Sequence, residues 1–339
     1  MNENDLKFIC TKLQLGSPAG VVTRVYGSRG GSFMWRVNTG KGSYAIKQLA
    51  TAIDLESEKL VTKYELSETI AYRFSQQGIP AVSALEKSGK HLVIIDNMGY
   101  LVYPWVEGYT LGRNEVSETH AIKIAETIAK LHDINMYVPE IKAPHVDTHT
   151  NGSIVEAIDK TASFQCPFSK RLKENQRLIL SMNDQYLAIA PLLLEDTIVT
   201  HGDLDQLNAL WNKANRPILI DWESVRKMNR TREIVRASLN WSGLGSEDFS
   251  LPIYDHMLRT YRKSGGMLNV HHINAALYSL VGSMVNWLLY NIKLACINDI
   301  SSAQDITIDE INWALMTMMR FKAKFHDLLK ISAENAKDT

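Results

Sequence analysis

The residues that decide the fold are a polar loop and the acidic residues that follow it: His201-Gly202-Asp203-Leu204-Asp205-Gln206-Leu207-Asn208, then Asp221-Trp222-Glu223. The run Thr197–Thr200 stands directly before this loop, and a second apolar run, Pro217–Trp222, contains Asp221. Short runs of this kind predict β-strands. We therefore expect one strand pair that flanks the loop and presents Asp221 at the end of its second strand.

Three side chains of this segment are those that phosphoryl transfer requires. The reaction needs a carboxylate near the attacking hydroxyl and oxygen ligands for a metal ion that neutralises the phosphates. A loop allows Asp203 and Asn208 to converge, and the strand end would hold Asp221 in front of them. The competing interpretation is that Asp203 and Asp221 are solvated loop carboxylates. The flanking strands and the order of the three residues favour a phosphoryl-transfer site.

A lysine inside an apolar strand is the second signal, in Tyr44-Ala45-Ile46-Lys47. Lysine is almost never fully buried unless it is paired. Glu68 lies on the same face of the following helix as Glu65, so it can pair with Lys47 and hold the lysine toward nucleotide phosphates. Two alternatives stay open: the strand turns Lys47 to solvent, or Glu68 is a surface charge.

A glycine-rich hairpin, Gly27-Ser28-Arg29-Gly30-Gly31-Ser32, stands between the first two expected strands. Glycines allow a tight turn and a close approach of the backbone to phosphates. We take Gly30, Gly31 and Ser32 as candidate nucleotide contacts. The hairpin does not have the Walker A pattern, and it is also explained as an ordinary turn.

The first third of the chain is rich in strand patterns and the remainder in helical ones. The expected strands are Val21–Tyr26, Phe33–Val37, Tyr44–Leu49, Val82–Glu86, Leu92–Ile95 and Tyr100–Tyr103. The expected helices are Glu56–Gln77, Glu118–His132, Ile154–Thr161, Ser169–Tyr186, Leu251–Lys263, Ile273–Ile297 and Ile308–Leu329. The composition changes near Trp105–Gly108, which predicts an α+β protein with a lobe at 1–104 and a helical lobe at 105–339.

Composition excludes several classes of protein. Lysine and arginine (37) equal aspartate and glutamate (37), so no global field attracts nucleic acid. The three cysteines show no paired spacing, which indicates buried thiols rather than disulfides or a zinc site. The acidic N-terminus leads into no apolar signal region, which predicts a cytoplasmic protein. The uncharged stretch Ala275–Ile292 is expected to be a buried helix and not a membrane span, because polar residues dilute it.

Together these residues resemble the aminoglycoside phosphotransferase and choline kinase group, a branch of the protein-kinase-like fold. The resemblance spans about residues 20 to 295 and rests on a series of motifs in the family order: the glycine-rich hairpin, Ala45-Ile46-Lys47, Glu68 with Gly78-Ile79-Pro80, Leu101–Gly108, Ile128–His132, His201–Asn208 and Asp221-Trp222-Glu223. It implies a two-lobed fold with a small antiparallel-sheet N-terminal lobe that binds the nucleotide and a mainly helical C-terminal lobe that carries the catalytic loop and the acceptor site.

The resemblance implies an enzyme that uses ATP or GTP and Mg²⁺ to phosphorylate a small-molecule hydroxyl. Asp203 would be the catalytic base, and Asn208 and Asp221 would bind Mg²⁺. His132 and His201 would have structural roles. The implied partners are a nucleotide and a small hydroxyl compound, with no nucleic acid and no membrane.

The nucleotide contacts that the resemblance implies lie in the first lobe. Lys47 would contact the phosphates, and Glu68 would position Lys47. Tyr103, Trp105 and Val106 would belong to the hinge whose backbone groups hydrogen-bond the purine.

The sequence departs from the protein kinases in the triplet Asp221-Trp222-Glu223, which replaces Asp-Phe-Gly, and no Ala-Pro-Glu follows. These departures disfavour a phosphorylation-regulated activation loop and protein substrates. A catalytically silent, nucleotide-binding pseudokinase that acts through protein contacts is the alternative function. Missing catalytic residues would favour it, and none is missing.

Two further carboxylates, Asp205 and Glu223, bear on the acceptor. Negative charge beside a phosphate-transfer site is unfavourable unless a cation offsets it. The sequence therefore predicts an acceptor that carries an amine. The alternative is that Glu223 braces the strand end while Asp205 faces solvent.

Overall fold

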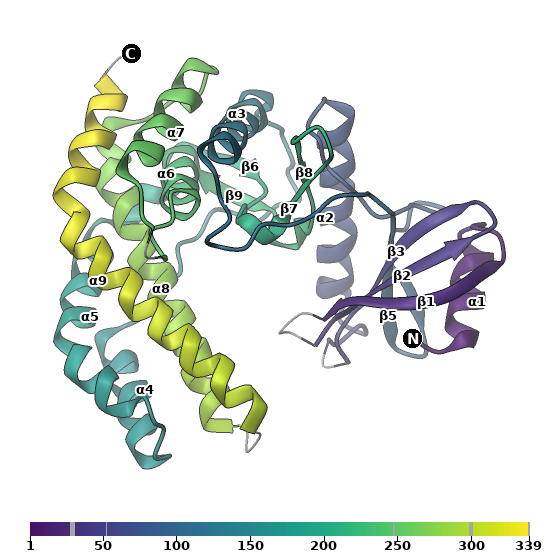
Figure 1. Ribbon diagram of the computed structural model, residues 1–339, viewed down its shortest axis with the longest axis horizontal. Coiled ribbons are helices and arrows are strands. Elements are labelled where there is room, and N and C mark those ends of the chain that lie inside the picture. The colour runs from purple at the N-terminus through teal and green to yellow at the C-terminus, as the bar shows by residue number, and fades with distance from the viewer. Residues whose placement is uncertain (28–30, 52, 247, 298–300, 338–339) are drawn as a thin grey trace. The chain divides into compact units, whose positions relative to one another are not determined.

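The computed structural model describes residues 1–27, 31–51, 53–246, 248–297 and 301–337, with the backbone alone described at 26–27, 297 and 301–307 (Figure 1). The chain forms two compact units. The N-terminal unit consists of Met1–Thr110 and Asn208–Val225, and the helical unit consists of Leu111–Leu207 and Arg226–Thr339. The chain thus passes from the helical unit to the N-terminal unit within the His201–Asn208 loop.

The N-terminal unit is built on a five-stranded antiparallel sheet with the order β1-β2-β3-β5-β4 (Figure 1). Its strands are β1 (Pro18–Gly27), β2 (Phe33–Thr39), β3 (Gly42–Gln48), β4 (Val93–Ile95) and β5 (Met98–Pro104). Each was predicted from the sequence, with differences at the ends.

The prediction of a sixth strand in this region, Val82–Glu86, is wrong, because the segment has no regular secondary structure. Side chains take up part of its backbone hydrogen bonding. The Ala84 amide donates to Glu68 Oε2 at 2.6 Å, and the Ala84 carbonyl oxygen lies 2.9 Å from His91 Nδ1. A strict alternation of apolar and polar residues identifies an extended segment. It does not show whether a neighbouring strand or a side chain forms the hydrogen bonds of that segment's backbone.

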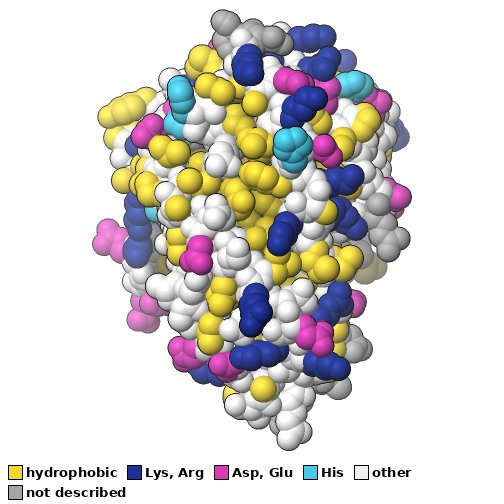
Figure 2. Space-filling view, turned by 90° about the vertical axis from the view of Figure 1, so that its left-hand side faces the viewer, with side chains coloured by type: hydrophobic (Ala, Val, Ile, Leu, Met, Phe, Trp, Pro, Cys, Tyr) yellow, Lys and Arg dark blue, Asp and Glu magenta, His cyan; other side chains and the backbone are white. Residues whose placement is uncertain are grey.

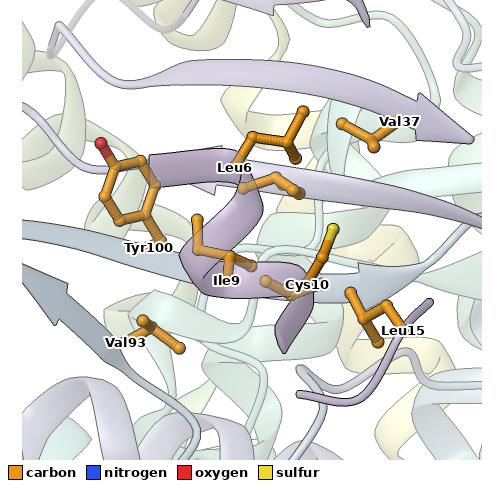
Figure 3. Close-up of a cluster of buried hydrophobic side chains, with 9 residues drawn as sticks. Leu6, Ile9, Cys10, Leu15, Val37, Val93 and Tyr100 are labelled. Atoms are coloured by element: carbon orange, nitrogen blue, oxygen red, sulfur yellow. The ribbon is translucent and has the colours of Figure 1, made fainter. Parts of the chain in front are cut away.

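Helix α1 (Glu3–Lys12) was not predicted, although its N-terminus carries a recognisable cap in which Asn2 accepts a hydrogen bond from the Asp5 amide at 2.8 Å. Its apolar face completes one core of the N-terminal unit (Figure 3), which contains Leu6, Ile9, Cys10, Leu15, Val37, Ile46, Val93, Tyr100 and Val102. Burying each large aliphatic side chain there contributes about 1.5–3 kcal/mol. This core holds β3, the strand that carries Lys47.

Helix α2 (Glu58–Gln76) was predicted, and it fixes the position of the acidic residues that follow the polar loop. Phe74 near its end stacks on Trp222 with 5.3 Å between the ring centroids, and both rings are fully buried. Trp222 stands between Asp221 and Glu223, so its packing anchors both carboxylates to the N-terminal unit.

The expected pairing of Thr197–Thr200 with Pro217–Trp222 is wrong. Strand β6 (Thr197–Thr200) pairs with β9 (Arg226–Asn229) in the helical unit, and β7 (Ala209–Trp211) pairs with β8 (Pro217–Leu219) in the N-terminal unit. The reason is a tight turn at 212–216, where Asn212 Oδ1 accepts hydrogen bonds from two backbone amides. This turn makes β7 and β8 a hairpin.

The helical unit contains α3 (Glu118–Ile134), α4 (Asn151–Ser163), α5 (Ser169–Ile189), α6 (Arg230–Trp241), α7 (Leu251–Lys263), α8 (Ile273–Ile297) and α9 (Ser301–Lys337). The bounds of α7 and α8 are those predicted. Helix α6 was not predicted, because buried polar residues such as Arg232, Glu233 and Ser238 interrupt its apolar pattern. Its N-terminal cap is Asn229, which accepts from the Arg232 amide at 2.9 Å.

Among the described residues no helix is long and apolar enough to cross a membrane. Helix α8, which holds the uncharged stretch, packs against α5, α6 and α9. On the face shown in Figure 2, apolar side chains lie among lysine, arginine, aspartate and glutamate. Cys10 is buried as expected, whereas Cys166 and Cys296 are partly exposed.

Candidate functional site

Lys47 of β3 is held between two carboxylates of the N-terminal unit. Its Nζ atom lies 3.0 Å from Asp221 Oδ1 and 2.6 Å from Glu223 Oε1, and its side chain is 12% exposed. Burial lowers the pKa of Lys47, but the charges of Asp221 and Glu223 outweigh burial and hold this pKa above its ordinary value. Lys47 is therefore a fixed cation directed into the unit and not a solvated strand residue.

Asp221 occupies an unusual backbone position. Strand β8 ends at Leu219, two residues before Asp221, so Asp221 does not stand at the end of a strand as the sequence predicted. Asp221 itself has left-handed backbone angles, φ 61° and ψ 62°. Aspartate tolerates this region better than most residues do, and such outliers concentrate at functional sites. The side chain of Asp221 is 45% exposed, so it can reach a ligand while it contacts Lys47.

Asn208 is brought beside Asp221 by the backbone. The Ile220 amide donates to the Asn208 carbonyl oxygen at 3.1 Å, directly before Asp221 in the chain. The two residues that the sequence marked as metal ligands therefore come from adjacent backbone segments of one unit. Among the described residues, no cluster of three or more histidine, cysteine, aspartate or glutamate side chains could hold a metal ion by itself.

Glu68 has partners other than the predicted one. It is buried, its Oε2 atom accepts from the Ala84 amide at 2.6 Å, and its Oε1 atom accepts from the Tyr103 hydroxyl at 2.8 Å. Burial raises the pKa of Glu68 to about 7, although both hydrogen bonds and the charge of Lys47 act in the opposite direction. Among the described residues Lys47 and Glu68 form no ion pair, because nearer carboxylates take the lysine.

Replacing Glu68 with alanine is expected to lower the free energy of unfolding by about 2 kcal/mol, because it leaves the Ala84 amide and the Tyr103 hydroxyl without their acceptor in a buried place. Urea denaturation measures this change. Glu58→Ala, an exposed position in the first turn of the same helix, is the control. Equal midpoints for the two variants would contradict the bracing role of Glu68.

The hinge and hairpin candidates lie in the same unit. The Trp105 amide donates to the Ser43 carbonyl at 3.0 Å, whereas the Val106 amide has no hydrogen-bond partner within the described part of the chain. Tyr103 directs its hydroxyl to Glu68. Gly31 has a φ of +84°, which favours glycine, and Ser32 is partly exposed. Gly30 lies outside the described residues.

The polar loop before Asn208 belongs to the helical unit, and α6 braces it. The Trp241 indole donates to the Leu204 carbonyl at 3.1 Å, and the Gln206 amide group donates to the Asn240 carbonyl at 2.9 Å. The side chain of Asp203 is 42% exposed, and its Oδ1 atom lies 3.7 Å from an Arg236 guanidinium nitrogen. The loop thus presents a carboxylate on a rigid support.

His132 is buried, as its predicted structural role requires. Its Nδ1 atom lies 2.8 Å from the Tyr261 hydroxyl, and its Nε2 atom lies 2.7 Å from Glu233 Oε2. Glu233 also accepts from the Thr200 hydroxyl in β6. This network connects α3, α6 and α7 to the strand that leads into the polar loop. His201 is fully buried at the start of that loop.

Comparisons with known proteins bear on the same residues. The model of the phosphotransferase enzyme family matches residues 28–263, most of the chain. This range contains Lys47, Glu68, Asp203, Asn208 and Asp221. A search among curated proteins finds no match.

Several solved structures share the fold. A spectinomycin phosphotransferase bound to AMP is 13% identical, with 100% of each chain covered and a TM-score of 0.65. Plasmodium vivax ethanolamine kinase is 16% identical, with 95% of this chain and 91% of that chain covered and a TM-score of 0.59. Choline kinase from Streptococcus pneumoniae is 16% identical, with 94% and 99% covered and a TM-score of 0.58. These likenesses confirm the predicted protein-kinase-like fold.

Proposed function

Because the chain belongs to the phosphotransferase enzyme family, we propose that it transfers the γ-phosphate of ATP or GTP to a hydroxyl group of a small molecule, with Mg²⁺ as cofactor. The observation that carries this proposal is the fixed cation Lys47 with Asp221 and Glu223 around it. Such an arrangement suits the phosphates of a nucleotide and the metal that accompanies them. In this proposal residues 1–104 form the nucleotide-binding lobe, and residues 105–339 form the lobe with the acceptor site.

The donor atoms near Asp221 fit Mg²⁺. This ion prefers hard oxygen ligands, and in phosphotransferases it is bound by one or two protein side chains together with waters and substrate phosphates. The Asp221 carboxylate and the Asn208 amide oxygen would be the protein ligands. Bound Mg²⁺ would neutralise the charge on the transferring phosphate.

The nucleotide would be held by residues of the N-terminal unit. Lys47 would contact its phosphates, and the Val106 amide, which no described residue engages, would donate to the purine. Glu68 would support the Lys47 contact indirectly. Its hydrogen bond with the Tyr103 hydroxyl holds that side chain beside β3, the strand that carries Lys47. Gly31 and Ser32 would contribute backbone groups to the phosphates.

Asp203 would act on the acceptor hydroxyl. In the reaction the acceptor oxygen forms a bond to the γ-phosphorus, and the bond between that phosphorus and the oxygen bridging it to the β-phosphate breaks. The hydroxyl proton passes to the Asp203 carboxylate, and the nucleoside diphosphate leaves. The exposure of Asp203 and its support by the α6-braced loop suit this role.

The amine on the acceptor stays a prediction. It rests on Asp205 and Glu223, two carboxylates whose negative charge beside the phosphates would require a cation nearby. Glu223 lies 2.6 Å from Lys47, and Asp205 Oδ1 accepts from the Leu207 amide at 3.0 Å. Both carboxylates therefore have partners within the protein. The contact of Glu223 with Lys47 suits the alternative in which Glu223 braces the strand end, whereas Asp205, which that alternative turns to solvent, also accepts a hydrogen bond.

A nucleotide-coupled assay tests the proposed function. We expect Mg²⁺-dependent release of ADP or GDP that requires a hydroxyl acceptor, measured over pairs that differ in one amine, such as glucosamine with glucose and ethanolamine with ethylene glycol. A preference for the amines that weakens at high ionic strength would support a cationic acceptor. Equal use of both members of each pair would reject it.

The silent pseudokinase makes a different prediction in the same assay. It would show saturable nucleotide binding in a thermal-shift titration and no acceptor-dependent turnover with any hydroxyl compound. Turnover above that of the Asp203→Asn variant excludes this alternative.

A further inference from the structure

Three arginines of the helical unit gather around the loop that carries Asp203. Arg226 begins β9 and donates from Nη2 to the Gly202 carbonyl at 3.0 Å. Arg236 of α6 lies 3.7 Å from Asp203 Oδ1. Arg232 is one helical turn before Arg236 and therefore lies on the same face of α6. We refer to Arg226, Arg232 and Arg236 as the arginine cluster.

Arg232 is the unusual member of the arginine cluster. Its relative exposure is 4%, and among the described residues its buried Nε atom has no hydrogen-bond partner. Burial lowers its pKa to about 10, and repulsion from Arg236 and Arg226 acts in the same direction. At neutral pH it is still a cation. A buried guanidinium nitrogen without a hydrogen-bond partner is costly, so it indicates a site that a ligand completes.

The negative groups near the arginine cluster are partly solvated or are held by other residues. Asp203 Oδ1 lies 3.7 Å from a guanidinium nitrogen of Arg236, and the Asp147 carboxylate is 44% exposed and lies 3.6 Å from His145. Tyr186 uses its hydroxyl to donate to the Asp147 backbone carbonyl at 3.1 Å. A third carboxylate, Glu233, also acts on Arg226, but it is buried and held by His132 and Thr200. None of these three carboxylates is a close partner of Arg232 among the described residues.

We propose that the arginine cluster binds a carboxylate or phosphate group carried by the acceptor. The identification of the ligand as the acceptor rests on the proposed function, in which Asp203 receives the proton of the acceptor hydroxyl. All three arginines belong to the same unit as Asp203, whereas the groups proposed to hold the nucleotide belong to the other unit. Guanidinium groups bind carboxylates and phosphates through paired, charge-assisted hydrogen bonds. The acceptor class is therefore a hydroxy acid or a hydroxyalkyl phosphate.

Binding without nucleotide tests the site directly. Glycerol 3-phosphate with glycerol, and gluconate with glucose, are probe pairs that differ in the anionic group. In thermal-shift titrations at constant ionic strength, we expect at least one anion to raise the melting temperature saturably while its neutral partner does not. If neither anion exceeds a sodium chloride control, the proposal is overturned.

Variants assign the effect to the arginine cluster. Arg232→Gln and Arg236→Gln are each expected to weaken binding of the anionic probe by about tenfold or more. Arg259→Gln, which removes an exposed guanidinium of α7, is the matched control and should bind as wild type does. Unchanged affinity in both cluster variants would overturn the proposal.

Stability separates a ligand site from a structural role. Since the Arg232 guanidinium is buried and its Nε atom has no hydrogen-bond partner, Arg232→Gln should leave the melting temperature of the free protein unchanged or raise it. A structural arginine would lower it. A lower melting temperature in Arg232→Gln, together with unchanged anion binding in Arg236→Gln, would assign the arginine cluster to folding.

The transferred phosphate is the other anion that could reach the arginine cluster. Comparing AMP-PNP, which has a γ-phosphate, with ADP distinguishes the two. If Arg232→Gln weakened only AMP-PNP and left the acceptor-like anions unaffected, the cluster would serve the nucleotide, and the proposal would be overturned. These binding measurements require no turnover. Intact anion binding without any phosphotransfer would therefore reject the proposed function and keep the anion site.

Discussion

Replacing Asp203 with asparagine is expected to lower the turnover number about a thousandfold and to leave nucleotide affinity nearly unchanged. Asparagine keeps the shape of the side chain but cannot accept the proton of the acceptor hydroxyl. Nucleotide affinity should persist because Lys47 and Asp221, the proposed nucleotide and metal contacts, belong to the N-terminal unit. Steady-state kinetics and a titration with AMP-PNP measure the two quantities.

A control for this variant is Asp159→Asn, which removes an exposed carboxylate of α4 paired with Lys173. It should behave as wild type. If Asp203→Asn retained more than about a tenth of the wild-type turnover, Asp203 would not be the base. If instead the turnover fell together with AMP-PNP affinity, Asp203 would act on the nucleotide and not on the acceptor.

Replacing Asp221 with asparagine is expected to weaken Mg-nucleotide binding as well as turnover. Loss of a side chain that only supports a metal ligand costs about 10- to 100-fold, and loss of a ligand should cost at least as much. Asparagine tolerates the left-handed backbone at this position, so the fold should survive the change. Lys47 keeps Glu223 as its partner at 2.6 Å.

The Mg²⁺ dependence distinguishes the two aspartates. Asp221→Asn should need a higher Mg²⁺ concentration for half-maximal rate, whereas Asp203→Asn should show the wild-type requirement. Nucleotide dissociation constants that are identical in wild type and both variants would contradict the roles assigned here. A circular dichroism spectrum and a melting temperature like those of wild type would show that the protein is still folded.

Local sequence patterns were sufficient for most elements because strand alternation, helical periodicity and turn residues act over a few residues. They identified β1 to β5, α2 and the bounds of α7 and α8. They missed α6, whose buried side contains Arg232 and Glu233, because charged residues on a buried face imitate a surface segment. They also paired β6 with the wrong strand, since pairing depends on which segments the turns bring together.

The sequence by itself determined the family and the two kinds of lobe, and it predicted the residues that take part in the chemistry, because motifs record residue types and their order. Only the tertiary structure decided the partners of these residues. Lys47 contacts Asp221 and Glu223, far away in the chain, and Glu68 instead holds Ala84 and Tyr103. The arginine cluster likewise became visible only when β9 and α6 were placed beside the Asp203 loop. Charges select partners by distance and burial in space, which no local pattern records.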